Sequence, residues 1–326
     1  MATSGRYSRL AGLLTVATVI IVVVLFGYLP GDSLLWRELQ NTGHIPLFGL
    51  LAITLLFMWR EWTGDSGAGS RVDYLVAGGA SLVIGIAIEF GQVLTKHHDP
   101  SISDATHDLA GILIALGIYA CIDSRMKPVW ARQRPGLRRA VIILACSLLI
   151  VCLFPLLKLA AACRDRAAAL PVIMDFTAGW AAPFLELRYA SLFTEGPAGA
   201  APHAAGRRLA GLRMKPGKFP GVSIIEPYRD WTGYESLVLA IYSPEPSPVD
   251  LVLRVHDRAH NQNHSDRFTR QFSIQQGENR LRVRLAEIEA APAGRNMNMS
   301  QIAGVILYAT DISRPLTLYL EALRLE

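Results

Sequence analysis

Six polar side chains stand within or beside long apolar runs of the sequence, where such groups are costly. They are His44, Glu89, Gln92, Asp104, His107 and Asp108. Asp104, His107 and Asp108 are spaced i, i+3 and i+4, so they share one face of a helix. Ionisable groups inside a membrane span face either protein or a water-filled cavity, and they mark functional sites. These six residues are referred to below as the polar cluster.

Four interpretations of the polar cluster are open from the sequence. It could bind a lipid headgroup or an envelope precursor, relay a proton or an ion, or hold a metal ion through imidazoles and carboxylates. It could also serve only to tie the helices together by hydrogen bonds. The chain has no H-E-x-x-H motif and no cysteine near the cluster. We therefore predict no metal, no cofactor and no catalytic residue.

The apolar runs that carry these residues predict five membrane-spanning helices. Charged residues make up 18% of the 326 residues and apolar residues 51%, whereas soluble proteins have about 25% charged residues. This composition excludes a protein that is soluble throughout. A span needs about 20 apolar residues to cross the hydrocarbon core. The expected spans are Leu10–Gly31, His44–Trp59, Tyr74–Leu94, Ala105–Ile122 and Ala140–Leu157.

Small residues in the third span predict which way Glu89 faces. Ala77, Ser81 and Gly85 recur every four residues, and Glu89 continues the same stripe. Small residues at this spacing let helices approach closely. We therefore expect Glu89 to face another helix rather than lipid.

Basic residues are distributed unevenly between the two sides of the expected spans. With the N-terminus inside, ten basic residues flank the inner ends, six of them between residues 125 and 139, and the outer loops hold only Arg37 and Lys96. The positive-inside rule therefore predicts a cytoplasmic N-terminus and an extracytoplasmic C-terminal half. This asymmetry explains the net charge of +5 better than nucleic-acid binding does.

Two stretches of the membrane half carry a family resemblance. The run Gly43–Leu51 is similar to the second helix of VanZ-like membrane proteins. The runs Ile88–Gln92 and Ser101–Gly111 are similar to that family's central motif, Glu-x-x-Gln followed by Asp-x-x-x-Asn-x-x-Gly. The resemblance covers roughly residues 10–122.

The match to this motif is incomplete. Four residues agree with it, namely Glu89, Gln92, Asp104 and Gly111. Asn41, His98 and Asp108 stand where the family commonly has Lys, Arg and Asn. The resemblance implies a multi-pass protein of the bacterial cytoplasmic membrane with membrane lipid as a partner. The family is associated with the cell envelope and with glycopeptide resistance.

The second half of the chain alternates apolar and polar residues with a period of two. Examples are the sets Leu237/Leu239/Ile241, Leu251/Leu253/Val255, Leu281/Val283/Leu285, Val305/Leu307 and Leu316/Leu318/Leu320. Such short runs, separated by Pro and Gly, favour an antiparallel β-sandwich. We expect a VanZ-like transmembrane domain over residues 1–162, a linker over 163–169 and a jelly-roll domain over 170–326.

The order of these strands over about residues 220–326 resembles galactose-binding-like jelly rolls. The runs that carry the resemblance are Asp230–Leu237, Gly277–Val283, Ile302–Val305 and Leu318–Leu325. Many carbohydrate-binding modules use this fold, so the resemblance implies a saccharide or glycolipid ligand. Trp231 and Tyr228 could stack on a sugar, or they could pack beneath the sandwich.

One almost wholly polar segment, the 257–267 loop, separates two of the expected strands. Its candidate ligand residues are Asp257, Arg258, His260, Asn261, Asp266 and Arg267. Such groups bind sugar hydroxyls or anionic headgroups, and Asp257, His260 and Asp266 could hold a cation. The alternative is a solvated hairpin loop that Asx-type turns stabilise.

Together these features predict a non-enzymatic envelope protein with an α-helical membrane bundle and an outer all-β domain. The outer domain is expected to bind a saccharide or glycolipid. The alternatives are a small transporter or membrane enzyme that uses the polar cluster, and a scaffold for a protein partner.

Overall fold

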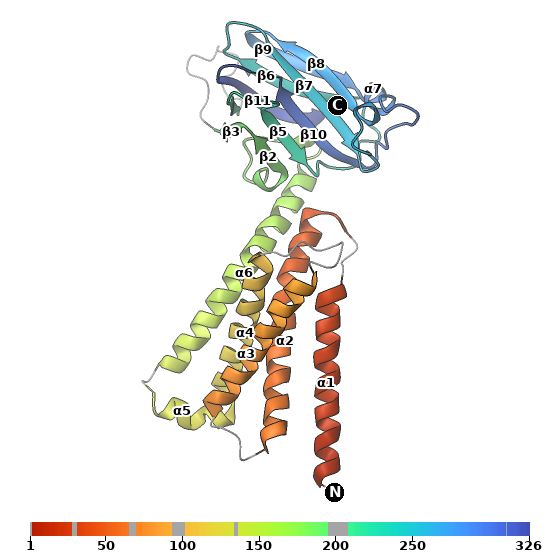
Figure 1. Cartoon of the computed structure of the whole chain (residues 1–326). Helices are drawn as coiled ribbons and strands as arrows, with labels where there is room; N and C mark the ends of the chain where they lie inside the picture. The colour runs from red at the N-terminus through yellow and green to blue at the C-terminus, as the bar shows by residue number, and fades with distance from the viewer. Residues whose placement is uncertain are drawn as a thin grey trace. The chain divides into compact units, whose positions relative to one another are not determined.

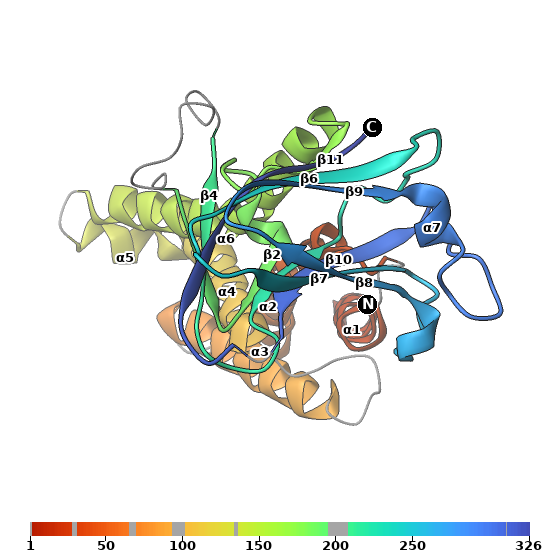
Figure 2. The same ribbon diagram turned by 90° about the horizontal axis from the view of Figure 1, so that it is seen from above.

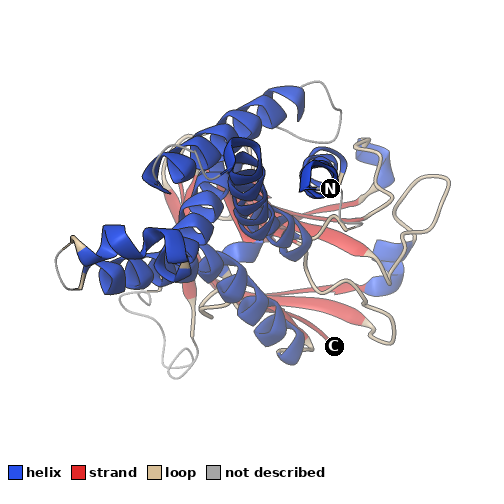
Figure 3. Cartoon of the chain, turned by 90° about the horizontal axis from the view of Figure 1, so that it is seen from below, coloured by secondary structure: helices blue, strands red, loops and turns tan. Residues whose placement is uncertain are grey.

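The computed structural model describes residues 2–27, 31–64, 70–92, 102–133, 136–194, 208–310 and 312–326. The chain forms two compact units, Met1–Lys158 and Leu159–Glu326 (Figure 1). The first unit is helical and the second is built mainly of strands, as the colours of Figure 3 show. Each unit is described by itself.

Five helices of the described residues are long and apolar enough to cross a membrane, which confirms the expected number. They are α1 (Ala2–Phe26), α2 (Leu34–Thr63), α3 (Ser70–Gln92), α4 (Ile102–Ile122) and α6 (Leu137–Ala168), and the short helices η2 (Ser124–Met126) and α5 (Lys127–Ala131) lie between the last two.

Two helices extend beyond the expected spans. Helix α2 begins ahead of His44, at Leu34, because the Ser33 side chain caps it by accepting a hydrogen bond from the Trp36 N–H at 3.3 Å. Helix α6 continues through most of the segment expected as a linker, and the division between the two units falls within it.

Small residues let α2 and α4 approach each other closely. A Cβ added at Gly111 would lie 2.3 Å from the Ile45 carbonyl oxygen, and one added at Gly49 would lie 3.0 Å from the Ala115 side chain. The expected stripe on α3 is also confirmed, because Ala77 and Ser81 are fully buried and Gly85 packs against Phe48. These contacts fix the helices that carry the polar cluster.

A buried ion network ties α2, α3 and the end of α4 together at the ends remote from the polar cluster. Arg60 on α2 donates to Asp73 on α3 at 3.3 Å and to Asp123, which follows α4, at 2.6 Å. The Tyr74 hydroxyl also donates to Asp123, at 2.9 Å. Arg60 and both carboxylates are at most 8% exposed. Removing one partner of such a network leaves a buried charge unpaired.

The second unit is an antiparallel β-sandwich, as expected. One sheet has the order β3-β4-β11-β6-β9, with β1 also paired to β11, and the other has the order β2-β5-β10-β7-β8. Figure 2 shows strands of the two sheets as separate layers. The elements are β1 (Val172–Met174), β2 (Leu185–Arg188), β3 (Ala190–Phe193), β4 (Ala210–Met214), β5 (Gly221–Ile225), β6 (Ser236–Ser243), β7 (Val249–Asp257), β8 (Phe268–Ile274), β9 (Gly277–Arg284), α7 (Leu285–Glu289), β10 (Ile302–Ala309) and β11 (Leu316–Leu325).

The core of the sandwich consists of the alternating residues that the sequence predicts. Each member of the five predicted sets is buried, with Val255, Val305 and Leu318 completely inaccessible. Trp231 is also 0% exposed, and its indole N–H donates to the Tyr228 carbonyl oxygen at 2.7 Å. Trp231 therefore packs beneath the sandwich and offers no surface for a sugar.

Candidate functional site

The structure brings part of the polar cluster together at one end of the helical unit. The Nδ1 atom of His44 on α2 lies 2.8 Å from Oδ1 of Asp108 on α4, and both side chains are buried. Glu89 on α3 joins them, since one ligand atom from each of the three residues lies within 4.8 Å of the others. These three helices thus supply one donor group each.

Two further members of the polar cluster, Asp104 and His107, lie on α4 with Asp108. Asp104 is buried one turn before Asp108, and its Oδ1 has no hydrogen-bond partner among the described residues. His107 is half-buried on the same helix. Gln92 closes α3, and its side chain lies outside the described residues.

The His44–Asp108 pair has two chemical capacities. A carboxylate that accepts the Nδ1 proton fixes the tautomer of an imidazole and leaves Nε2 as a base. With Glu89, the same atoms form a nitrogen and oxygen donor set of the kind that binds divalent metal ions. The geometry is therefore compatible with a proton relay and with a metal site, as well as with a hydrogen-bonded tie between the helices.

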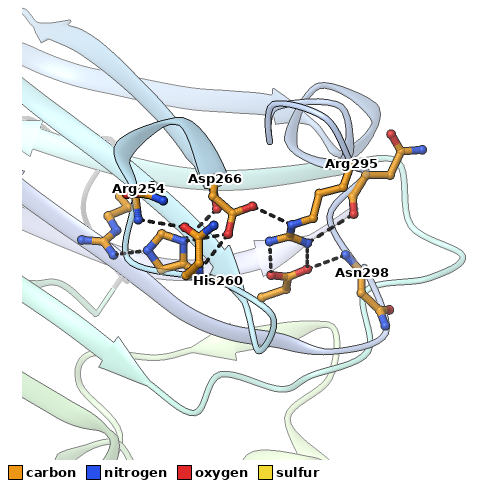
Figure 4. A network of polar contacts seen from close by, with 9 residues as sticks. Arg254, His260, Asp266, Arg295 and Asn298 are labelled. Atoms are coloured by element: carbon orange, nitrogen blue, oxygen red, sulfur yellow. Dashed lines mark hydrogen bonds and ion pairs between the residues drawn. The ribbon is translucent and has the colours of Figure 1, made fainter.

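In the second unit, Asp257 forms an ion pair with Arg295, which is not among the ligand residues predicted from the sequence. Arg295 donates to Asp257 through Nη1 at 2.6 Å and through Nη2 at 2.8 Å, and the Asn298 N–H donates to the same carboxylate at 2.8 Å (Figure 4). Burial alone would raise the pKa of Asp257, but these hydrogen bonds hold it below its ordinary value. Its side chain is 0% exposed.

Asp266 completes this network from the other end of the 257–267 loop. Arg295 Nε donates to Asp266 at 2.6 Å and the Asn261 N–H donates to it at 2.8 Å, which together lower the pKa of Asp266 to about 2. The guanidinium thus stands between the two carboxylates, where a bound cation was one expectation for this loop.

Other residues of the loop form hydrogen bonds that stabilise the loop itself. The Asn263 N–H donates to the Asn261 side chain at 2.9 Å, which is the expected Asx-type turn. The backbone N–H of Arg258 donates to Gln301 at 3.0 Å. The side chain of His260 is 2% exposed. Arg267 lines a groove on the open face of the five-stranded sheet.

A row of aromatic residues crosses the open face of the six-stranded sheet, and sequence reasoning missed it. Pairing across β3, β4, β11 and β6 aligns Phe193, Gly211, Tyr319 and Tyr242, followed by Glu278 on β9. The Tyr319 ring lies 6.0 Å from Phe193 and 6.2 Å from Tyr242. A Cβ at Gly211 would lie 2.2 Å from the Phe193 ring, so only glycine leaves room for it.

Beside this row lies a groove of about 500 Å³, the six-strand groove. Its floor contains Val238 and Ala240, which alternate with the core residues of β6 and so point away from the core. Its polar lining consists of both signs of charge. The residues concerned are Glu278, Arg280, Glu321 and Arg324, and Tyr242 forms the aromatic wall.

No protein-family model and no curated protein matches the chain. Among solved structures it is similar to an exo-beta-agarase, with 18% identity over 48% of this chain and 24% of that one and a TM-score of 0.38. It is also similar to a family 11 carbohydrate-binding module from Clostridium thermocellum, solved with a mixed-linked tetrasaccharide, with 10% identity over 47% of this chain and 93% of that one and a TM-score of 0.35.

The chain spans about a quarter of the agarase. The VanZ-like resemblance of the helical unit stays a prediction.

Replacing Arg295 should destabilise the second unit more than any surface charge does. Arg295→Gln leaves Asp257 buried without a cation, so we expect the free energy of unfolding to fall by roughly 3 kcal/mol. Arg164→Gln, which removes an exposed partner of Asp165, should change it by less than about 0.5 kcal/mol. Thermal unfolding of the full chain at pH 7 measures both, and equal effects would contradict the structural role of Arg295.

Acid should weaken the second unit through His256 on β7. Burial and the positive charge of Arg254 lower the pKa of His256 to about 4, so between pH 6.5 and 4 only the unfolded chain binds this proton. The free energy of unfolding should therefore fall by roughly 2 kcal/mol over this window as the pH drops. His256→Asn should flatten the slope, whereas His264→Asn, at an exposed position of the 257–267 loop, should not. An unchanged slope in His256→Asn refutes this assignment.

Proposed function

We propose that this protein is a non-enzymatic membrane protein of the bacterial cell envelope whose C-terminal β-sandwich binds a saccharide in the six-strand groove. The five apolar helices anchor it in the cytoplasmic membrane. The positive-inside distribution favours a cytoplasmic N-terminus and an extracytoplasmic sandwich.

The observation that carries this proposal is the aromatic row beside a groove of about 500 Å³. Ligand sites have volumes of about 300–1,000 Å³, with apolar walls and a few polar groups that fix orientation. An aromatic face such as that of Tyr242 packs against the apolar face of a sugar ring. Carboxylate and guanidinium groups such as Glu278 and Arg280 form charge-assisted hydrogen bonds with hydroxyl groups.

The site proposed here differs from the ligand site that the sequence predicts. The 257–267 loop was the expected contact surface, but Asp257 and His260 are buried in a network that is already satisfied. The six-strand groove offers polar side chains next to accessible aromatic area. We therefore assign sugar contact to the sheet face. Membrane lipid stays the expected partner of the helical unit.

A glycan array probed with the full chain in neutral detergent tests this function. We expect at least one oligosaccharide to bind, and we expect Tyr242→Ala to weaken its affinity at least about tenfold, since a stacking surface is lost. Tyr234→Ala, a half-buried tyrosine outside this groove, is the matched control. The proposal fails if no oligosaccharide binds at millimolar concentration, or if both variants bind as the native chain does.

A second candidate function rests on the His44, Glu89 and Asp108 trio. The three groups could hold a divalent cation or move a proton in a small transporter or membrane enzyme. This function is favoured by one observation, the approach of their ligand atoms to within 4.8 Å.

Zn²⁺ and Mn²⁺ titrations of the full chain, followed by calorimetry, test this second candidate. Cation binding that Asp108→Asn and His44→Gln each abolish would support it. Asp250→Asn, on β7 in the other unit, should leave such binding intact. If neither ion binds, the cation-binding role is wrong, and proton transfer and a hydrogen-bonded tie between helices are the roles that remain.

A further inference from the structure

A second groove lies on the open face of the five-stranded sheet and is lined by three arginines. It measures about 210 Å³, and its lining includes Arg188, Arg254, Arg267, Ser223, Phe219 and Tyr308. We call it the arginine groove. Because the two sheets pack by their inner faces, it opens on the side of the sandwich opposite the six-strand groove.

Strand pairing places these side chains in adjacent rows. Arg254 on β7 is opposite Ile306 on β10, which is opposite Ser223 on β5. Tyr308 occupies the neighbouring row, opposite Gly221. Arg254 alternates with the core residues Leu253 and Val255, so its side chain leaves the core and reaches the open face.

The arginine groove carries positive charge, and Glu186, which strand pairing places opposite Ser223 on the same face, forms no ion pair with its arginines among the described residues. No carboxylate lines it, and in the described part of the chain none of its three arginines forms an ion pair. Other arginines of the same unit behave differently, since Arg270 pairs with Glu287 and Arg280 with Glu326. Clustered guanidinium groups repel one another unless an anion binds between them.

Buried donors around the arginine groove also lack acceptors. The Nε atoms of Arg254 and Arg267 are inaccessible and have no hydrogen-bond partner within the described ranges, and neither does the hydroxyl of Thr269, which pairs with Arg254 across β7 and β8. A buried donor left unsatisfied costs about 1–3 kcal/mol. The described residues therefore leave part of the hydrogen-bonding capacity of Arg254 and Arg267 unused beside the groove.

The 257–267 loop holds Arg254 in position through His260. The Nδ1 atom of His260 lies 2.8 Å from the Asp266 carbonyl oxygen, which can only accept, so Nδ1 carries the proton. Its Nε2 atom therefore accepts from Arg254 Nη2, at 3.0 Å. Figure 4 shows this chain of contacts from Arg254 through His260 and Asp266 to Arg295. Arg254 is preorganised before any ligand arrives.

Besides burial, the low pKa of His256 reflects the positive charge of the same arginines. Its ring lies 5.1 Å from that of His260, and after burial the charge of Arg254 is the next cause of its low pKa, with Arg267 contributing. The positive charge that disfavours a proton on His256 would favour an anion bound nearby.

We propose that the arginine groove binds a phosphate or sulfate ester, with Arg254 and Arg267 contacting the oxyanion. Guanidinium forks match the oxygen geometry of such groups bidentately. Phe219 is 44% exposed, and its ring meets that of Tyr308 edge to face at 5.4 Å. These rings supply an apolar surface for the body of the ester. The site is separate from the six-strand groove, so it does not depend on the function proposed there.

Calorimetry with the full chain in neutral detergent tests the site, with inorganic phosphate, glucose 6-phosphate and glucose 6-sulfate as probes at constant ionic strength. We expect the esters to bind and glucose not to bind at this site. Arg254→Gln and Arg267→Gln should each weaken ester binding at least about tenfold. Arg254→Lys, which keeps the charge without the fork, should weaken it less than Arg254→Gln.

Two control variants establish that the ester binds in the arginine groove. Arg229→Gln, outside the groove, should leave ester binding unchanged, and Tyr242→Ala should do so as well. Binding that Tyr242→Ala removes would place the ester in the six-strand groove and overturn the proposal. Unfolding temperatures of all variants show which of them keep their fold.

Vesicles distinguish the source of the oxyanion. Binding to phosphatidylglycerol vesicles but not to phosphatidylcholine vesicles, lost in Arg254→Gln, supports the same site with a lipid headgroup as its ligand. If no ester and no anionic vesicle binds, or if both arginine variants bind as the native chain does, the proposal is wrong.

Discussion

The guanidinium group of Arg295 is the interaction on which much of the sandwich's polar architecture depends. Two carboxylates withdrawn from water need a positive partner with several donors, and Arg295 satisfies both Asp257 and Asp266. Asp266 then offers its carbonyl to His260, which in turn accepts from Arg254. Arg295, beside the loop, therefore helps to determine where the guanidinium group of Arg254 lies on the open face of the five-stranded sheet. The loop therefore positions Arg254 through His260 and also contributes its own Arg267 to the lining of the arginine groove.

The helical unit obeys the same constraint with different groups. Arg60 compensates Asp73 and Asp123 at one end of the helices, while at the other end His44 pairs with Asp108. Polar groups that are buried away from water are stabilised by pairing with one another. Each network therefore fixes the positions of the helices that it joins relative to one another. Glycine and alanine at the contacts bring the backbones near enough for such short side chains to meet.

The sequence predicts the buried faces of strands from local periodicity, and it predicts which polar residues meet from their positions along the helices. The alternation in Leu251–Val255 identifies the buried face of a strand, and the positions of His44 along α2 and Glu89 along α3 place them at a similar depth in an antiparallel bundle. Arg295 could not be found in this way, since it lies 38 residues from Asp257 in a segment with no periodicity. The aromatic row was hidden as well, because it exists only once four strands have paired in register.

The two sheets of the sandwich each leave one face open, and each open face carries a groove of different character. One combines aromatic area with mixed charge, and the other concentrates guanidinium groups. Occupation of either leaves the other accessible, so a single sandwich can join two molecules or two parts of one polymer. Contacts that are weak separately become strong when linked, because the first raises the effective concentration for the second. Under the two proposals above, such a domain would cross-link its ligands, and its affinity would depend on the spacing of binding groups along the target.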